Sequence, residues 1–179
     1  VSIGAHPAFP DLQGFGRRRM DIPATELEAM IIYQIGALQA MAAAEGSCVS
    51  HVKPHGALNN MACADPALAD CVARAIHAIS PQLILLAPAY CRLATAGERI
   101  GLPVIPHIYP VVVRDGAAVI SDRAEDIAYA ARVGLEMGAD VVKIPYTGDA
   151  ASFADIVSVT PIPVSITKML RRPSAASPL

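Results

Sequence analysis

The stretch CVSHVKPHGALNNMACADPALADCVARAIHAISPQLILLA, residues 48–87, contains one complete repeat of the pattern that decides the fold. Short apolar runs at 48–52 and 83–87 predict two strands. Between them an Asp-Pro pair opens a helix expected over 65–79, because proline is favoured in the first helical turn. Residues 53–60, KPHGALNN, are expected to form the loop at the carboxyl end of the first strand. A strand, a helix and a second strand in this order indicate a βα unit of a parallel sheet.

The same alternation extends along the rest of the chain. Further strands are expected at 1–5, 102–108, 140–144 and 164–167, further helices at about 23–45, 90–100, 122–137 and 151–157, and a small hairpin around Asp115-Gly116. A complete eight-fold barrel takes about 250 residues. We therefore predict an α/β fold: an incomplete (βα) barrel of about five or six βα units. Residues 1–170 are expected to form one domain and 171–179 a disordered tail.

Composition restricts the classes of function. Hydrophobic residues make up 54% of the 179 residues and charged residues 17%, which excludes a disordered chain. The net charge of -2 lacks the basic excess that nucleic-acid binding requires. In the longest apolar segment, 30–44, Gln34 and Gln39 argue against a membrane span. The four cysteines show no metal-site spacing, and we expect them to be reduced, buried thiols of a cytoplasmic protein.

The loop after the first strand carries the first group of candidate site residues. They are His6 and Asp11 as catalytic candidates, and Gly14, Gly16, Arg17 and Arg18 as substrate-binding candidates. Glycines let backbone N–H groups approach an anionic ligand, and guanidinium groups bind carboxylate or phosphate through two hydrogen bonds. The alternative is a solvated run of arginines beside a structural histidine.

The loop after the second strand adds Lys53 as a substrate-binding candidate and His55 as a catalytic candidate. Together with His6 and Asp11, these side chains could bind a divalent metal ion of unknown identity or position a water molecule. A zinc site made by His51 and His55 is not expected. Their spacing brings side chains together only on a helix, and the intervening proline argues against one.

Tyr109 and Lys143 follow later strands and suggest a different chemistry. A lysine at the inner end of a buried strand has a lowered pKa, so its neutral amine can form a Schiff base with a carbonyl substrate. Tyr109 or Tyr146 would then transfer protons. The alternatives are a lysine that extends from the strand end into water and a tyrosine that only lines a pocket.

The motifs IGAHPAFPDLQGFGRRRMD, YQIGALQAMA and HVKPHGALNNMACADPALADCVARAI resemble the LamB/YcsF family, the A subunit of bacterial 5-oxoprolinase, over residues 1 to about 104. The resemblance implies a (βα) barrel and ATP-dependent opening of 5-oxoproline to glutamate together with B and C partner subunits. The motif residues include Gln34, whereas Asn59 stands where the family usually has a tyrosine. Two N-terminal family motifs precede the stretch matched, so the site is expected to be incomplete.

From about residue 105 to 168 the pattern changes. AEDIAYAARVGLEMGADVVKIPYTGD and SFADIVSVTPIPVSI are similar to archaeal-type class I fructose-bisphosphate aldolases of the DeoC-like group. That resemblance makes Lys143 the Schiff-base lysine and Tyr109 the proton-transfer residue, with no cofactor required.

Three hypotheses follow from this hybrid, or chimera, of two barrel families. The chain is a hydrolase like the 5-oxoprolinase A subunit, a Schiff-base aldolase acting through Lys143, or an inactive hybrid scaffold. The first uses ATP, a small-molecule substrate and two partner subunits, and none of the three implies nucleic acid or a membrane. The unpaired edges of an incomplete barrel sheet also favour a homo-oligomer.

Overall fold

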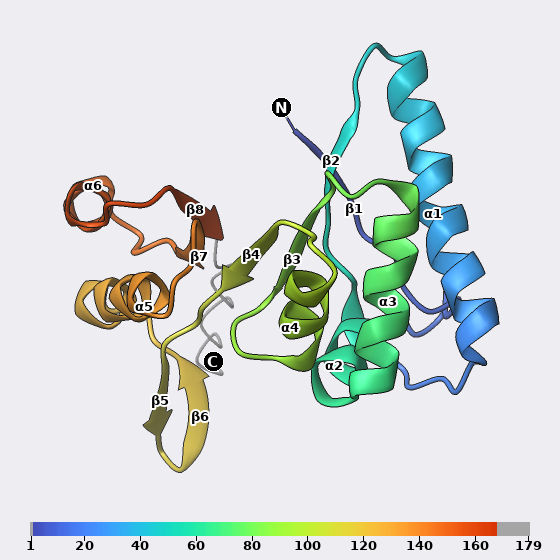
Figure 1. Cartoon of the computed structure of the whole chain (residues 1–179). Helices are drawn as coiled ribbons and strands as arrows, with labels where there is room; N and C mark the ends of the chain where they lie inside the picture. Colours follow the sequence, from blue (N-terminus) through green and yellow to red (C-terminus); the bar gives the residue numbers. More distant parts are fainter. Residues whose placement is uncertain (1, 168–179) are drawn as a thin grey trace, which may run out of the picture. The chain divides into compact units, whose positions relative to one another are not determined.

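The computed structural model describes residues 2–167 and divides the chain into two compact units. The first extends from Val1 to His107, and the second begins at Ile108. Each unit has its own strands and helices (Figure 1). Each unit also has its own cluster of buried hydrophobic side chains.

The first unit contains four parallel strands in sequence order. They are β1 (Ile3–Ala5), β2 (Val49–Val52), β3 (Ile84–Pro88) and β4 (Val104–His107). The register pairs Ala5 with Val52, Val52 with Leu85, and Pro88 with His107. Adjacent parallel strands in chain order are what successive βα units produce. All four carboxyl ends therefore lie at one edge, where the loops after the strands gather.

Four helices connect these strands: α1 (Ala24–Ala44) follows β1, α2 (Gly56–Ala64) and α3 (Pro66–Ile79) follow β2, and α4 (Arg92–Arg99) follows β3. The start of α3 is as predicted, since the Asp65 side chain accepts hydrogen bonds from the N–H groups of Ala67 and Leu68. The predicted loop at 53–60 is wrong, because α2 begins within it at Gly56. His55 is extended and Gly56 has a φ of 57°, so one tight turn leads directly from β2 into the helix.

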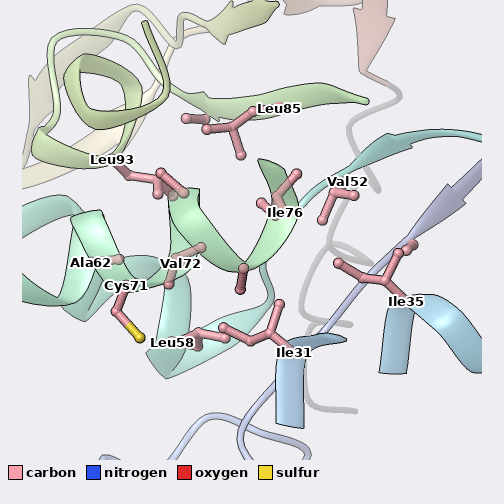
Figure 2. Close-up of a cluster of buried hydrophobic side chains, with 14 of the residues drawn as sticks. Ile31, Ile35, Val52, Leu58, Ala62, Cys71, Val72, Ile76, Leu85 and Leu93 are labelled. Atoms are coloured by element: carbon pink, nitrogen blue, oxygen red, sulfur yellow. The ribbon is translucent and has the colours of Figure 1, made fainter. Parts of the chain in front are cut away.

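One continuous hydrophobic core holds the first unit together (Figure 2). The α1 side chains Leu27, Ile31 and Ile35 are buried in the same cluster as Ile76 of α3 and Leu85 of β3. By length and composition alone α1 could cross a membrane. Its four buried residues, Leu27, Ile31, Ile35 and Ala42, belong to this core, and 22% of its apolar window is buried.

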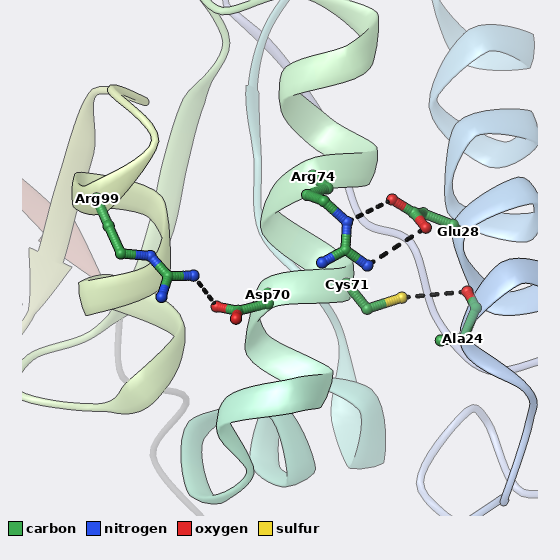
Figure 3. A network of polar contacts seen from close by, with 6 residues as sticks. All are labelled: Ala24, Glu28, Asp70, Cys71, Arg74 and Arg99. Atoms are coloured by element: carbon green, nitrogen blue, oxygen red, sulfur yellow. Dashed lines mark hydrogen bonds and ion pairs between the residues drawn. The ribbon is translucent and has the colours of Figure 1, made fainter.

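Polar contacts connect α3 to α1 and to α4 (Figure 3). Arg74 of α3 donates to Glu28 of α1 at 3.1 Å, and Arg99 of α4 donates to Asp70 at 2.5 Å. The thiol of Cys71 donates to the carbonyl oxygen of Ala24 at 3.3 Å. The two ion pairs are partly exposed, so they orient the helices more than they stabilise them.

The second unit begins with the predicted hairpin. Strands β5 (Val111–Arg114) and β6 (Ala117–Ile120) are antiparallel, and the two turn residues Asp115 and Gly116 have φ angles of 52° and 76°. A two-residue turn with a positive φ at both residues matches the twist of the two strands that it joins. The hairpin predicted from the Asp-Gly pair is therefore confirmed.

The rest of the second unit repeats the βα pattern. Helix α5 (Ala124–Glu136) precedes β7 (Val142–Pro145), and α6 (Ala150–Val159) connects β7 to the parallel strand β8 (Val164–Thr167). The core of this unit is small, formed by Ile127, Ala131, Ile144, Phe153 and Ile156.

The predicted fold class, α/β of incomplete (βα) barrel type, is confirmed by these parallel βα units. The predicted tail at 171–179 lies outside the described residues. That residues 1–170 act as one domain stays a prediction.

Candidate functional site

The loops after β1 and β2 run side by side beyond the ends of the strands. Lys53 N–H donates to the carbonyl oxygen of Ala5, and His55 N–H donates to that of Pro7, both at 2.9 Å. This continued pairing places the side chains of His6 and His55 together, with His55 Nδ1 2.9 Å from His6 Nε2. The structure therefore brings two of the predicted catalytic residues into direct contact.

The hydrogen bonds of this pair determine where its protons lie. A carbonyl oxygen can only accept, so His6 Nδ1, in contact with the Lys53 carbonyl, carries a proton. His55 Nε2, 2.8 Å from the Phe15 carbonyl, carries one for the same reason. Two neutral rings would then place two bare acceptors against each other, so the bond between the rings requires a third proton.

Asp11 is buried beside the pair and is fully engaged by its own loop. Arg18 forms an ion pair with it through two guanidinium nitrogens, with the Nε contact at 2.9 Å. The N–H groups of Gly14 and Arg18 also donate to the carboxylate. The side-chain hydrogen bond from Arg18, with these N–H donors, lowers the pKa of Asp11 to about 2. Asp11 is therefore held as a carboxylate.

The glycine-rich loop does not offer its N–H groups to an outside anion. Every N–H group from residue 14 to residue 18 donates to an acceptor within the loop, including Gly16 to the Asp11 carbonyl at 2.8 Å. The Asp11 carboxylate itself accepts two of these N–H groups, those of Gly14 and Arg18. Gly14 is needed for this arrangement, since a Cβ there would lie 2.0 Å from Asp11 Oδ2.

Gly16 and Gly56 let this loop approach the start of α2. The Gly16 carbonyl accepts a hydrogen bond from Ala57 N–H at 2.9 Å. Both glycines have positive φ angles, and a Cβ on Gly56 would lie 2.4 Å from the Gly16 oxygen. This contact holds Phe15 next to His55, and their rings pack edge to face at 5.1 Å.

A cavity of about 750 Å³ opens beside the histidine pair. Its lining includes the apolar side chains Phe9, Leu12, Phe15, Met30 and Tyr33 and the polar side chains His6, Asp11, Gln34 and His55. An apolar pocket with a few convergent polar groups is the usual form of a small-molecule site.

Gln34 is a positioning residue that residue types alone did not indicate. From α1 it clamps the loop after β1: Ala8 N–H donates to Gln34 Oε1 at 3.0 Å, and Gln34 Nε2 donates to the Ala8 carbonyl at 2.9 Å. The only signal for it was the YQIGALQAMA motif.

Two further cations, Arg17 and Lys53, belong to the loops that form this site. Arg17 is exposed and stacks over Phe15, with its guanidinium carbon 5.6 Å from the ring centroid. Lys53 is half-buried at the carboxyl end of β2. Their role as substrate-binding residues, like that of the glycines and Arg18, stays a prediction.

The sequence allowed a metal ion at this site. Across residues 2–167 no group of three or more His, Cys, Asp or Glu side chains is arranged to hold a metal ion. All four ring nitrogens of His6 and His55 take part in hydrogen bonds, and Asp11 is bound by Arg18. These residues do not fit a metal in this arrangement.

Lys143 and Tyr109 belong to the second unit. Lys143 lies half-buried in β7, where its carbonyl oxygen accepts a hydrogen bond from Ile108 at 2.9 Å. Burial lowers the pKa of the Lys143 amine. Tyr109 is half-buried in the segment between β4 and β5. Of the YTGD residues after Lys143, Asp149 caps α6 by accepting from Ser152 N–H at 2.7 Å.

The expectation of buried thiols is wrong for three of the four cysteines. Cys71 is buried, whereas Cys63 and Cys91 are intermediate and Cys48 is exposed. Apolar neighbours in sequence do not show how exposed a cysteine is: Cys48 lies just before β2, Cys91 just before α4, and Cys63 on one face of α2.

The LamB/YcsF family profile matches residues 1–139. The chain is 55% identical to the 5-oxoprolinase A subunit of Azoarcus sp. (strain BH72) over 125 residues, 70% of this chain and 49% of the relative. It is 42% identical to the 5-oxoprolinase A subunit of Brevibacillus brevis over 163 residues, 84% of this chain and 64% of the relative. The chain thus spans about half to two thirds of the length of these relatives.

Among solved structures, the lactam utilization protein from Thermus thermophilus is similar, with a TM-score of 0.62 and 39% identity over 76% of this chain and 58% of that one. An archaeal fructose-1,6-bisphosphate aldolase has 28% identity over 51% of this chain and 41% of that one, with a TM-score of only 0.37. The family match continues past residue 104 to 139, and the aldolase-like part stays a prediction.

Proposed function

Because the chain belongs to the LamB/YcsF family, we propose that it acts as a 5-oxoprolinase A subunit in the hydrolysis of 5-oxoproline to glutamate. The observation that carries this proposal is the hydrogen-bonded His6–His55 pair beside a largely apolar cavity. We infer that the two rings share a third proton and so carry one positive charge. The reaction takes place in the cytoplasm with B and C partner subunits and consumes ATP.

The chemistry of the substrate fits this cavity. 5-Oxoproline is a small five-membered lactam that carries a carboxylate, so it needs a positive charge and an apolar surface in one place. The histidine pair provides the charge, and Phe9 and Met30 provide apolar surface. Asp11 and Arg18 neutralise each other and keep the loop in position.

Hydrolysis breaks the ring C–N bond: water supplies hydroxide to the carbonyl carbon and a proton goes to the nitrogen. The proton shared by His6 and His55 is available for transfer to that nitrogen, and the pair regains it from the attacking water. ATP would supply a phosphoryl group that activates the lactam carbonyl, with release of ADP, and a second water molecule would release that group as inorganic phosphate. The loop at 14–18 uses its N–H groups internally, so we assign ATP binding to the partner subunits.

The test compares His6→Gln and His55→Gln with His77→Gln, a change at an exposed histidine of α3. With B and C subunits present, 5-oxoproline-dependent glutamate formation should fall about 100-fold or more in the first two variants. It should remain unchanged in the third. Calorimetric titration of the chain alone with 5-oxoproline separates binding from turnover. Full activity of both site variants would reject the proposal.

The second candidate is the Schiff-base aldolase, favoured by the lowered pKa of Lys143. Borohydride reduction in the presence of a ketose phosphate should then add the substrate mass at Lys143 and not in a Lys143→Met variant. No adduct at Lys143 with sugar phosphates or small aldehydes would rule this candidate out. If both candidates fail, the inactive scaffold remains.

We also propose that the chain associates with further copies or partners. Strand β1 is the first strand of its sheet and pairs on one side with β2. An open edge favours pairing with another chain. Light scattering that shows a monomer at high concentration would contradict self-association.

A further inference from the structure

Two of the four cysteines meet at the edge of the first unit where the loops gather. Cys63 lies in the last turn of α2, and Cys91 is the residue immediately before α4. The two thiols interact directly, and both side chains pack on the same hydrophobic core while remaining partly exposed. Two segments separated by more than twenty residues thus bring a pair of sulfur atoms together.

The surroundings of the two sulfur atoms differ. Cys91 receives the hydrogen bond from the Cys63 thiol and lies at the N-terminus of α4, where the N–H groups of Ala94 and Leu93 favour a negative charge. These contacts lower the pKa of Cys91 to about 6. The same contact and burial raise the pKa of Cys63. The helix N-terminus therefore favours the negative charge on Cys91, with Cys63 as its thiol partner.

The other two cysteines lack this arrangement. Cys71 is buried, its thiol donates to the Ala24 carbonyl, and burial raises its pKa (Figure 3). Cys48 is exposed and lies next to the start of β2, at the opposite end of the strand from Lys53. Lys53 is close enough to Cys63 for its charge to act on that thiol.

We propose that Cys63 and Cys91 form a reversible redox pair that hydroperoxides oxidise to a disulfide. The inference rests on two partly exposed thiols in contact, one at a helix N-terminus, and does not depend on the proposed hydrolysis.

The chemistry has two steps. The Cys91 thiolate attacks hydrogen peroxide, the O–O bond breaks, and Cys91 becomes a sulfenic acid with release of hydroxide. The Cys63 sulfur then displaces the sulfenic oxygen, which leaves as water after taking the Cys63 proton. The released hydroxide takes up a solvent proton, so two thiols and one peroxide give one disulfide and two water molecules. A dithiol reductant restores both thiols by exchange.

A disulfide here would connect the end of α2 to the start of α4. Since α2 begins at Gly56, directly after His55, the bond would restrain the helix that follows the candidate site. It would also remove the negative charge of Cys91 from this edge of the sheet.

The test uses the reduced chain, treated with one equivalent of hydrogen peroxide, blocked with maleimide and mapped by mass spectrometry. We expect two of the four thiols to be lost, a Cys63–Cys91 linked peptide, and full recovery with dithiothreitol. Cys63→Ser should leave a sulfenic acid on Cys91 that dimedone traps. Cys91→Ser should slow the peroxide reaction about tenfold or more.

Cys48→Ser and Cys71→Ser are the matched controls and should form the linked peptide as the wild type does. Retention of all four thiols would overturn the proposal. So would a bond that joins Cys48 to another chain as the main product, or equal peroxide rates in Cys91→Ser and the wild type. The mass-spectrometric map of the oxidised wild-type chain tests the proposal even if a variant fails to fold.

Discussion

His6 and His55 are 49 residues apart in sequence, yet His55 Nδ1 lies 2.9 Å from His6 Nε2. Each ring also contacts a backbone carbonyl, of Lys53 and Phe15 respectively. The pair therefore joins the loops after β1 and β2 at the mouth of the cavity. Three protons on the two rings would satisfy all three of these hydrogen bonds.

Removal of one ring should loosen both loops. His55→Ala removes the bonds to His6 and Phe15, and hydrogen bonds to a charged partner contribute about 1.5–3 kcal/mol each when buried. Because this pair is partly exposed, we expect a loss of about 1–2 kcal/mol in the free energy of unfolding. Urea unfolding measures it, and His77→Ala should change little. Independently, nitrogen-15 NMR should detect three N–H protons on the pair; two would reject the shared proton.

The Asp11–Arg18 ion pair predicts a specific acid response. The pKa of Asp11 is about 2 in the folded chain against an ordinary value of 3.8, so its folded pKa is depressed. The stabilisation is complete above 3.8 and is lost as the pH falls toward 2. Asp11→Asn should therefore be less stable than the wild type at neutral pH, and the gap should narrow within that window.

Arg18→Gln provides the matched comparison, because Arg18 is the largest cause of the depressed pKa. Between neutral and acid pH, the free energy of unfolding of the Arg18→Gln variant should change less than that of the wild type. Urea midpoints measured at closely spaced values from about pH 2 to about pH 7 would show it. An identical gap between Asp11→Asn and the wild type at every pH would contradict the assignment.

Gly56 and Gly36 should respond to alanine in opposite directions. Gly56 has a φ of 57°, and a Cβ there would lie 2.4 Å from the Gly16 oxygen, so Gly56→Ala should cost about 1–3 kcal/mol. Gly36 lies inside α1, where an added Cβ would have no neighbour within 4 Å, so Gly36→Ala should stabilise by about 0.5–1 kcal/mol. Urea midpoints that shift in the same direction would count against the close approach.

The buried side-chain oxygen of Asn59 in α2 is expected to lower the free energy of unfolding. Asn59 is 8% exposed, and within the described part of the chain its Oδ1 accepts no hydrogen bond, while Nδ2 makes one weak contact to Asn60 at 3.3 Å. Asn59→Leu is similar in size and removes the unsatisfied oxygen. It should raise the free energy of unfolding by about 1–2 kcal/mol. Asn60→Leu, at the exposed neighbouring position, should not; equal gains would point to helix propensity instead.

Local signals predicted much of the fold. The Asp-Pro pair at 65–66 indicated the start of α3, the Asp-Gly pair at 115–116 indicated the hairpin, and the strand at 164–167 has the predicted bounds. These features depend on neighbouring residues, so a local pattern suffices. The error at 53–60 has a local cause too: Pro54 and Gly56 suggest a loop, but here they form the short turn into α2.

The candidate site was predictable only in part. The loops that carry His6, Asp11, Lys53 and His55 follow from the strand pattern, since parallel strands end at one edge. The strand pattern did not show which of these groups would contact one another. Arg18 binds Asp11 within its own loop, and Cys63 meets Cys91 across two helices.

The amino-acid sequence by itself determined the α/β class, most element positions and the family, because periodicity, caps and motifs act over short distances in the chain. Tertiary structure alone decided that His6 lies in hydrogen-bond contact with His55, that the Asp11 carboxylate accepts N–H groups of its own glycine-rich loop, and that Cys91 has a thiol partner. Such contacts depend on backbone approach within a few ångströms between segments far apart in sequence. Glycines such as Gly16 and Gly56 permit that approach, and no local pattern shows which partners it selects.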